Sequence, residues 1–172
     1  PAFIPRSGGL FKDFTIHDLD LARWLLDEPV VEVFTAASCL VDPEIGRLGD
    51  VDTARTVLRT ESGRLCVISN TRRSGYGYDQ RIEAFGSAGA LRAGNVTEST
   101  VEAWTEGGAQ ADQFQNFFLD RYAAAYKFEM AHFADMIARN AAPEISYGDG
   151  VAALALATAA QASMQSGAPV QL

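Results

Sequence analysis

The chain has few of the residues that bind metals or form disulfides. Its 172 residues include two histidines and two cysteines, and none of them stands at an HxH, CxxC or HExxH spacing. Such spacings bring metal ligands together, so we expect no metal site. Cys39 and Cys66 lie singly in apolar, β-branched runs. Isolated thiols of this kind are typical of a reducing compartment, so we expect a cytoplasmic protein in which both cysteines pack in the interior.

A long apolar segment and a basic surface are also missing. No stretch of about 18 or more apolar residues occurs, so the sequence predicts no membrane-spanning helix. The formal net charge is −8 and the sequence pI is about 4.7, and this charge disfavours binding to nucleic acid phosphates. The opening residues, PAFIPRSGG, are neither basic nor apolar enough for a signal peptide. Because no initiator Met is present, we expect these opening residues to come from the middle of a longer chain.

Residues that can carry chemistry are concentrated near the start of the chain, in residues 8–26, GGLFKDFTIHDLDLARWLL. Asp13, His17 and Asp20 are four and three residues apart, so on a helix they share one face. The other face carries apolar side chains that we expect to enter the core: Ile16, Leu19, Trp24 and Leu26. An acid, a histidine and a second acid beside an apolar stripe make this segment the candidate functional centre.

The chemistry that Asp13 and His17 can perform is general base catalysis. A neutral imidazole accepts protons well near neutral pH because its ordinary pKa is about 6.5. A carboxylate one helical turn away can accept the other ring N–H, which fixes the tautomer of the imidazole. The alternative is a plain surface helix, in which Asp13 and Asp18 interact with the positive end of the helix dipole and His17 has no role. The spacing alone allows both interpretations.

The rest of the chain predicts a block of strands followed by two helices. We expect a loop over residues 42–50. The predicted strands cover residues 30–41, 52–60, 64–70, 79–85, 90–93 and 100–105, and the predicted helices cover residues 114–139 and 151–165. The aromatic stripe of the first of these two helices, which includes Phe118, Tyr122 and Phe133, is expected to be part of the core. This order indicates a single α+β domain over residues 1–172, with an open, predominantly antiparallel sheet and helices on one face. The uncovered face of such a sheet favours pairing with a second copy, so we expect a homo-oligomer.

A second polar segment, residues 72–81, reads RRSGYGYDQR. Its tyrosines, amide, acid and arginines surround flexible glycines, and such a set can line a pocket for a polyhydroxylated ligand, in which each hydroxyl needs a donor and an acceptor. A solvated turn covered by aromatic rings is the alternative.

Four blocks in the sequence match a known family in order and spacing. They are GGxxxDxxIHDxD at residues 8–20, GDVDT at 49–53, GYGYDQRIEAFG at 75–86, and an arginine, two tyrosines, a glutamate and a phenylalanine within residues 121–133. Together they resemble the C-terminal domain of the Gfo/Idh/MocA oxidoreductases. The YDQR stretch at residues 78–81 favours the members of this family that act on inositol.

The resemblance implies an α+β substrate domain that works with an N-terminal Rossmann domain, which binds NAD or NADP. That domain is missing from this chain, since no strand–GxGxxG–helix unit occurs here. The implied activity is the NAD(P)-dependent oxidation of a secondary ring hydroxyl of inositol, or of a similar cyclic polyol or sugar, to a ketone. The chain alone is expected to be inactive and to bind no cofactor tightly.

The resemblance also implies roles for single residues. His17 corresponds to the proton acceptor and Asp13 to the acid that orients it, whereas Asp20 and Tyr76 correspond to contacts with substrate hydroxyls. Two alternatives stay open: a dehydrogenase for another sugar or polyol, and a non-catalytic assembly or ligand-binding module that kept the fold.

Overall fold

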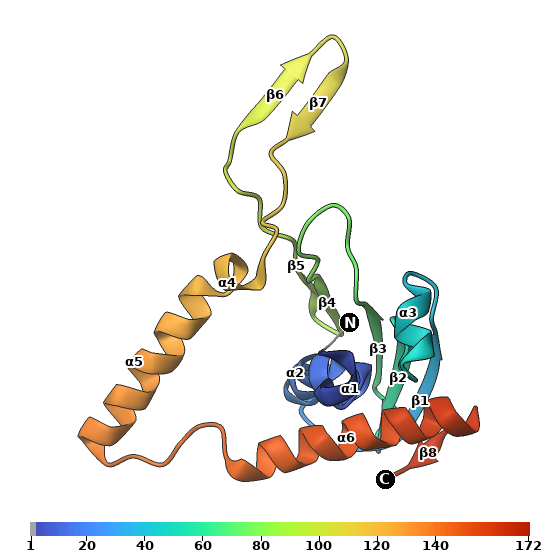
Figure 1. Cartoon of the computed structure of the whole chain (residues 1–172). Helices are drawn as coiled ribbons and strands as arrows, with labels where there is room; N and C mark the ends of the chain where they lie inside the picture. Colours follow the sequence, from blue (N-terminus) through green and yellow to red (C-terminus); the bar gives the residue numbers. More distant parts are fainter. Residues whose placement is uncertain (1–2) are drawn as a thin grey trace. The chain divides into compact units, whose positions relative to one another are not determined.

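The computed structural model describes residues 3–172, which form two compact units (Figure 1). The first unit joins the segment that ends at Arg73 to Ile145–Leu172, and the second comprises Ser74–Glu144. Within residues 3–172, no helix combines the length and the apolar character needed to cross a membrane.

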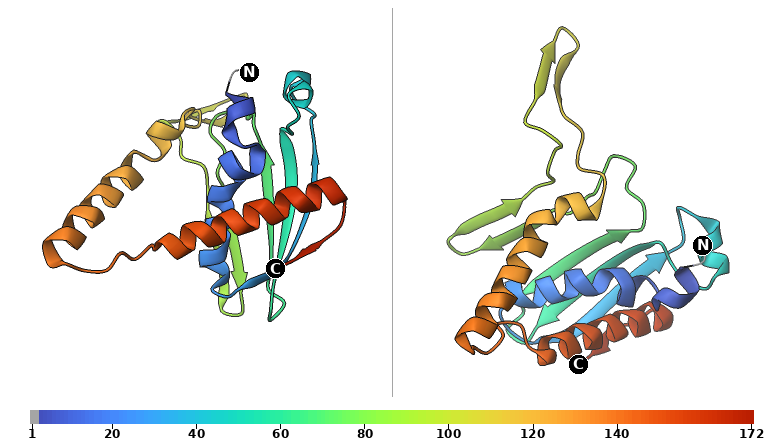
Figure 2. Two further views of the ribbon diagram at one scale, coloured as in Figure 1. Left: turned by 60° about the horizontal axis from the view of Figure 1, so that its bottom comes forward. Right: turned by 60° about the vertical axis from the view of Figure 1, so that its left-hand side comes forward.

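The first unit is an antiparallel sheet with helices on one face. Its strands lie in the order β3-β2-β1-β8, and their bounds are Leu65–Thr71, Thr53–Thr60, Val30–Ser38 and Val170–Gln171. The two long helices, α2 (Ile16–Leu26) and α6 (Tyr147–Ser166), cover the same face of this sheet (Figure 2). Three short helical segments complete the unit: α1 (Ile4–Ser7), the π-helix η1 (Phe11–Thr15) and α3 (Pro43–Arg47). The predicted α+β class, with an open antiparallel sheet, is confirmed.

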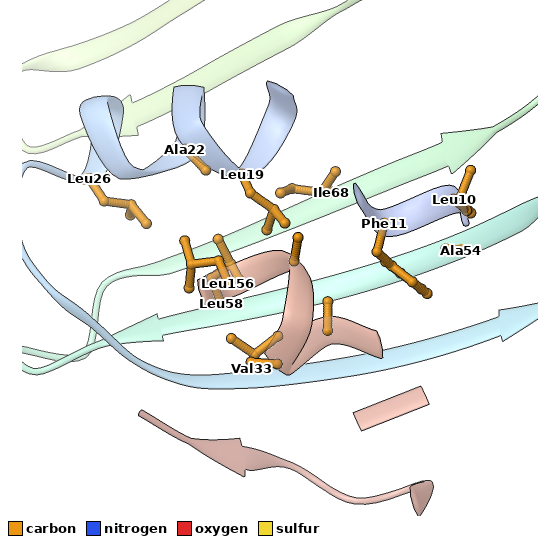
Figure 3. Packing of buried hydrophobic residues seen from close by; sticks show 13 residues of the cluster. Leu10, Phe11, Leu19, Ala22, Leu26, Val33, Ala54, Leu58, Ile68 and Leu156 are labelled. Carbon is orange, nitrogen blue, oxygen red and sulfur yellow. The ribbon is translucent and has the colours of Figure 1, made fainter. Parts of the chain in front are cut away.

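The core of this unit lies between the sheet and the two long helices (Figure 3). Strand β2 alternates as the period of a half-buried strand requires, with Ala54, Thr56, Leu58 and Thr60 buried on the helix side. Opposite them, α6 buries alanines, whose small side chains let a helix approach a sheet closely: Ala153, Ala157, Ala159 and Ala160. Two of the buried threonines form a cross-strand hydrogen bond, in which the Thr35 hydroxyl donates to that of Thr56 at 3.1 Å.

The second unit consists of two hairpins and two helices. Strand β4 (Ile82–Gly86) pairs with β5 (Gly89–Ala93), and β6 (Glu102–Thr105) pairs with β7 (Gly108–Ala111). Helices α4 (Phe118–Arg121) and α5 (Ala123–Arg139) follow. The side chains described in this unit are half-buried or exposed. The predicted burial of the aromatic stripe in the helix over residues 114–139 is therefore wrong: Phe118 and Phe133 are 40% and 52% exposed.

Several predicted element bounds also need correction. The helix expected over residues 8–26 is interrupted, because Gly8 and Gly9 have φ of 89° and 88° and regular α-helix begins only at Ile16. Trp24 is 76% exposed rather than buried, because the buried stripe of α2 consists of Leu19, Ala22 and Leu26 at the i, i+3, i+7 positions.

The second set of corrections concerns the loop, the late strands and the cysteines. The expected loop contains α3, whose start is marked by a side-chain cap from Asp42 to the Glu44 N–H and by Pro43 at the first position. The predicted helix over residues 114–139 begins only at Phe118 and divides at Tyr122. Strands β7 and β8 were not expected from the pattern. Cys39 and Cys66 are half-buried rather than interior.

One buried hydroxyl links α6 to the edge of the sheet. Strand β8 pairs with Glu32 and Val33 of β1. Two residues further along β1, the Thr35 N–H donates to the Ser163 hydroxyl at 2.9 Å. That hydroxyl in turn donates to the Ala168 carbonyl at 2.7 Å, and Ser163 has no exposed surface.

We expect Ser163→Ala to lower the free energy of unfolding by about 1–3 kcal/mol, because it leaves the buried Thr35 N–H without its partner and removes the shorter hydrogen bond to the Ala168 carbonyl. Urea unfolding followed by circular dichroism measures this difference. Ser166→Ala is the matched control, since Ser166 also bonds to the Ala168 carbonyl but is exposed. Equal losses in both variants would contradict the role given to Ser163.

Candidate functional site

The candidate site begins in the π-helical turn η1 and continues into the first turn of α2. Asp13 lies in η1, and His17 is the second residue of α2. Single π-helical turns are rare and are found frequently at functional sites. The turn is entered through Gly9, where a Cβ would lie 3.3 Å from Oδ1 of Asp50. A glycine is thus required both by the positive φ and by the close approach of a carboxylate.

Asp13 is held by a charged bridge that links three segments of the first unit. Nη1 of Arg72 donates to Oδ2 of Asp13 at 3.2 Å, and Nη2 of Arg72 donates to Oδ2 of Asp50 at 3.0 Å. The other oxygen of Asp50 accepts the Leu10 N–H at 3.1 Å. The three charged side chains are 23%, 13% and 12% exposed for Asp13, Arg72 and Asp50. We call this set the Asp13–Arg72–Asp50 bridge.

His17 is exposed and so is accessible to a substrate. Within residues 3–172 no hydrogen bond joins it to Asp13, whose carboxylate binds Arg72 instead. A charge-assisted bond from a guanidinium is stronger than one from a neutral imidazole, which accounts for this preference. The structure thus places Asp13 and His17 one turn apart, as the spacing predicted, but without the direct contact that was expected.

A second set of hydrogen bonds, made by Asn70 of β3, anchors the same helical segment. Nδ2 of Asn70 donates to Oδ2 of Asp18 at 2.8 Å, and the buried Thr15 hydroxyl donates to Oδ1 of Asn70 at 3.0 Å. Burial raises the pKa of Asp18 above its ordinary value, and the Asn70 hydrogen bond and the charge of His17 act in the opposite direction. Burial, together with the charge of Asp18, also raises the pKa of the Cys66 thiol. Asp18 is therefore an acid that interacts electrostatically with His17.

The remaining predicted site residues lie in separate surroundings. Asp20 pairs with Arg23, with Oδ1 and Nη1 3.2 Å apart, and its side chain is 46% exposed. Tyr76 belongs to the second unit, where its hydroxyl donates to Asp79 and its ring meets Phe114 edge to face at 6.3 Å.

The loop around Tyr76 is held by hydrogen bonds to Asp79 and by close packing of Gly77 against Phe114. Hydrogen bonds from Arg81 at 2.7 and 2.8 Å lower the pKa of Asp79 to about 2. Gly77 has a φ of 123°, and a Cβ there would lie 2.8 Å from Cβ of Phe114. The glycine-spaced tyrosines predicted from the sequence thus form an ordered polar surface within this unit.

Sequence reasoning missed Asp50 and Asn70 as parts of the site, and it placed Arg72 in the polar segment of residues 72–81 without recognising it as the partner of Asp13. The alternation of side chains along β3 could have identified Asn70 and Arg72. Ile68, Asn70 and Arg72 occur at every second position and so point to the helix side, where a polar residue needs a partner.

Comparison with known proteins identifies the fold family. Residues 3–92 match the model of the GFO/IDH/MocA C-terminal domain. The chain belongs to the Gfo/Idh/MocA family. Among curated relatives, it is 48% identical over 170 residues to myo-inositol 2-dehydrogenase of Thermotoga maritima, and 46% identical over 162 residues to inositol 2-dehydrogenase of Rhizobium meliloti. These matches cover 99% and 94% of this chain but 51% and 49% of the relatives.

Solved structures of family members agree with this assignment. The crystal structure of a probable dehydrogenase from Thermotoga maritima superposes with a TM-score of 0.96 at 48% identity, covering 99% of this chain and 51% of that one. Scyllo-inositol dehydrogenase from Lactobacillus casei, solved with NAD(H) and scyllo-inositol, gives a TM-score of 0.89 at 26% identity, covering 96% and 48%. The chain therefore spans about half the length of the relatives it matches.

The raised pKa of Asp18 predicts a pH-dependent cost in stability. Because the folded state binds this proton more tightly than the unfolded state, the cost is absent below both pKa values and grows as rising pH ionises the buried acid. We expect the free energy of unfolding of Asp18→Asn, relative to that of the parent protein, to increase as the pH rises from about 3 to about 5.5. This range avoids most histidine titration.

The urea midpoints of the variant and its parent across this range measure the effect. Glu61→Gln, in the exposed turn between β2 and β3, serves as the control and should show a smaller change. A stability difference for Asp18→Asn that stays constant or shrinks with rising pH would oppose the prediction.

Proposed function

We propose that this chain is the substrate-binding and catalytic half of an NAD(P)-dependent inositol 2-dehydrogenase, which oxidises a secondary ring hydroxyl to a ketone. The observation that carries the proposal is the exposed His17, one helical turn from the anchored carboxylate of Asp13. The identity to inositol dehydrogenases over nearly the whole chain supports the substrate class.

In this proposal His17 accepts the proton of the hydroxyl that is oxidised, and Asp13 provides a negative charge beside the imidazolium that forms. Oδ2 of Asp13 is bound to Arg72, whereas Oδ1 has no partner within residues 3–172 and can accept a hydrogen bond from the imidazole or from a substrate hydroxyl. Asp20 and Tyr76 are proposed as further contacts to ring hydroxyls. For Asp20 this requires that its carboxylate be shared with Arg23.

The residues of this chain do not fit the binding of a dinucleotide. Phosphates of such cofactors bind at a glycine loop between a parallel strand and a helix. The strand pairs of residues 3–172 are all antiparallel, and Gly8 and Gly9 lead into a π-helical turn rather than follow a strand. We therefore assign NAD or NADP to a separate N-terminal domain, and propose that the 172-residue chain alone does not turn over substrate.

The open face of the sheet is proposed as a homo-oligomer interface. Phe34 lies opposite Val57, and Val57 lies opposite Val67, so the three side chains form an apolar row across the strands. Val67 is 65% exposed and Phe34 is 37% exposed. Apolar rows on a sheet face without covering helices are typical of association surfaces.

Val67→Lys is expected to shift the full-length protein toward smaller species, because it places a charge in the centre of this row. Sedimentation velocity at several protein concentrations measures the shift. Glu61→Lys, in the turn outside the row, should leave the distribution unchanged. An unaltered distribution for Val67→Lys would exclude this face as the interface.

In the full-length protein, His17→Ala is expected to lower kcat for inositol by about 10²–10⁴-fold, the usual range for loss of a general base. The dissociation constant for NADH, from fluorescence titration, should stay nearly constant. His132→Ala, an exposed histidine on α5, is the matched control and should retain full turnover. A parallel loss of dinucleotide binding, or unchanged turnover on a panel of inositols and sugars, would argue against the role of His17.

A further inference from the structure

Arg72 occupies a defined position at the end of the sheet. It directly follows β3, and its backbone N–H donates to the carbonyl of Asp52 at 2.9 Å. Because side chains alternate along a strand, it shares the helix-facing side with Asn70. The position of Arg72 in the main chain thus places its guanidinium beside the π-helical turn η1, where Asp13 lies.

The guanidinium lies between two carboxylates and is bound to both. Nη1 and Nη2 reach Asp13 and Asp50 at 3.2 and 3.0 Å, and the Arg72 side chain is only 13% exposed. A planar guanidinium with two terminal nitrogens can hold two acids at a fixed angle, which a lysine ammonium does less well. Partial burial also reduces the screening that weakens ion pairs at the surface.

Asp50 is itself fixed, so the bridge has a rigid base. Its Oδ1 accepts the Leu10 N–H, and Leu10 is fully buried. The bridge therefore connects the loop after α3, the end of β3 and the π-helical turn. Without Arg72, the Asp13 side chain would be free to rotate about its own bonds.

From this arrangement we propose that Arg72 is a positioning residue for the dehydrogenase reaction: held by Asp50, it orients the Asp13 carboxylate toward the substrate side of His17. The inference rests on the proposed function and adds to it a residue that acts through Asp13. Arg72 itself contacts neither the substrate nor the cofactor in this proposal.

The helical segment has anchors that do not involve Arg72. Leu10 and Phe11 are buried in the core, and Thr15 and Asp18 are bound through Asn70. Removal of the guanidinium is therefore expected to affect the direction of the Asp13 carboxylate more than the fold.

The test uses the full-length protein with its cofactor domain. Arg72→Gln is expected to lower kcat by about 10–100-fold, the scale of loss that follows misplacement of a catalytic group, with little change in the dissociation constant for NADH. Arg72→Lys should recover part of the activity, because it restores the charge but not the two-armed geometry. Arg64→Gln is the matched control, since Arg64 precedes β3 and pairs with Glu28 at the other end of the strand.

The decisive readout is a double-mutant cycle between Arg72 and Asp13. If Arg72 acts through Asp13, Asp13→Asn combined with Arg72→Gln lowers kcat no more than Asp13→Asn alone. Losses that multiply would overturn the positioning role and show that Arg72 acts independently of Asp13.

Failure of this inference can be told apart from failure of the proposed function. Unchanged turnover in both His17→Ala and Asp13→Asn would refute the proposed function. Large losses in those two variants, with normal kcat in Arg72→Gln, would refute the positioning role alone.

Thermal melting decides whether Arg72→Gln folds. If it does not, Asp50→Asn replaces it, because an asparagine can still accept the Leu10 N–H while it weakens the hold on Arg72. A reduced kcat in Asp50→Asn that disappears in the Asp13→Asn background would support the inference, and an unchanged kcat would overturn it.

Discussion

The candidate site depends on polar side chains at the end of β3, which tie the sheet to the helical segment. Asn70 binds Thr15 and Asp18, and Arg72 binds Asp13. These bonds come from positions that alternate on one side of a strand, so their spacing is set by the strand itself. The helix is thereby held at two points on either side of His17, and its rotation relative to the sheet is determined by directional bonds as well as by packing.

The apolar core supplies the stability that such a polar arrangement requires. Leu10, Leu19, Val33 and Leu58 are fully buried, and burial of a side chain of this size contributes about 1.5–3 kcal/mol. Buried charges, by contrast, contribute little net stability because of their desolvation cost. The bridge around Arg72 is therefore explained better by the position it gives to Asp13 than by its effect on folding.

The sequence allowed the prediction of the fold class and of the segment that carries the site. Alternating apolar residues predicted β2 and β3, and the spacing of Asp13 and His17 predicted their one-turn separation. The π-helical turn was not predictable from the local pattern, because the residue before it is bound to a carboxylate that is distant in the sequence: the Leu10 N–H donates to Oδ1 of Asp50, 40 positions away. The partner of Asp13 was missed for the same reason, since Arg72 lies 59 residues further along the chain.

In the second unit, the sequence predicted a helix but did not predict correctly which of its side chains are buried. Its helical period was read correctly over most of α5, but burial was inferred from that period alone, and Phe133 is exposed within the described unit. An apolar stripe indicates that a helix face can be buried, but it does not identify the surface that would cover that face.

The electrostatic surroundings of His17 are what a proton acceptor needs. Asp18 is near enough to His17 for a charge on the imidazole to act on the pKa of the Asp18 carboxyl and lower it. Three acids, Asp13, Asp18 and Asp50, belong to the two polar groups that hold this helix, against the one cation Arg72. Because the guanidinium is bound to both Asp13 and Asp50, it limits the mutual repulsion of these two carboxylates. In the proposed reaction, the proton accepted by His17 would enter a region of net negative charge that is in place before a substrate binds, as preorganised catalysis requires.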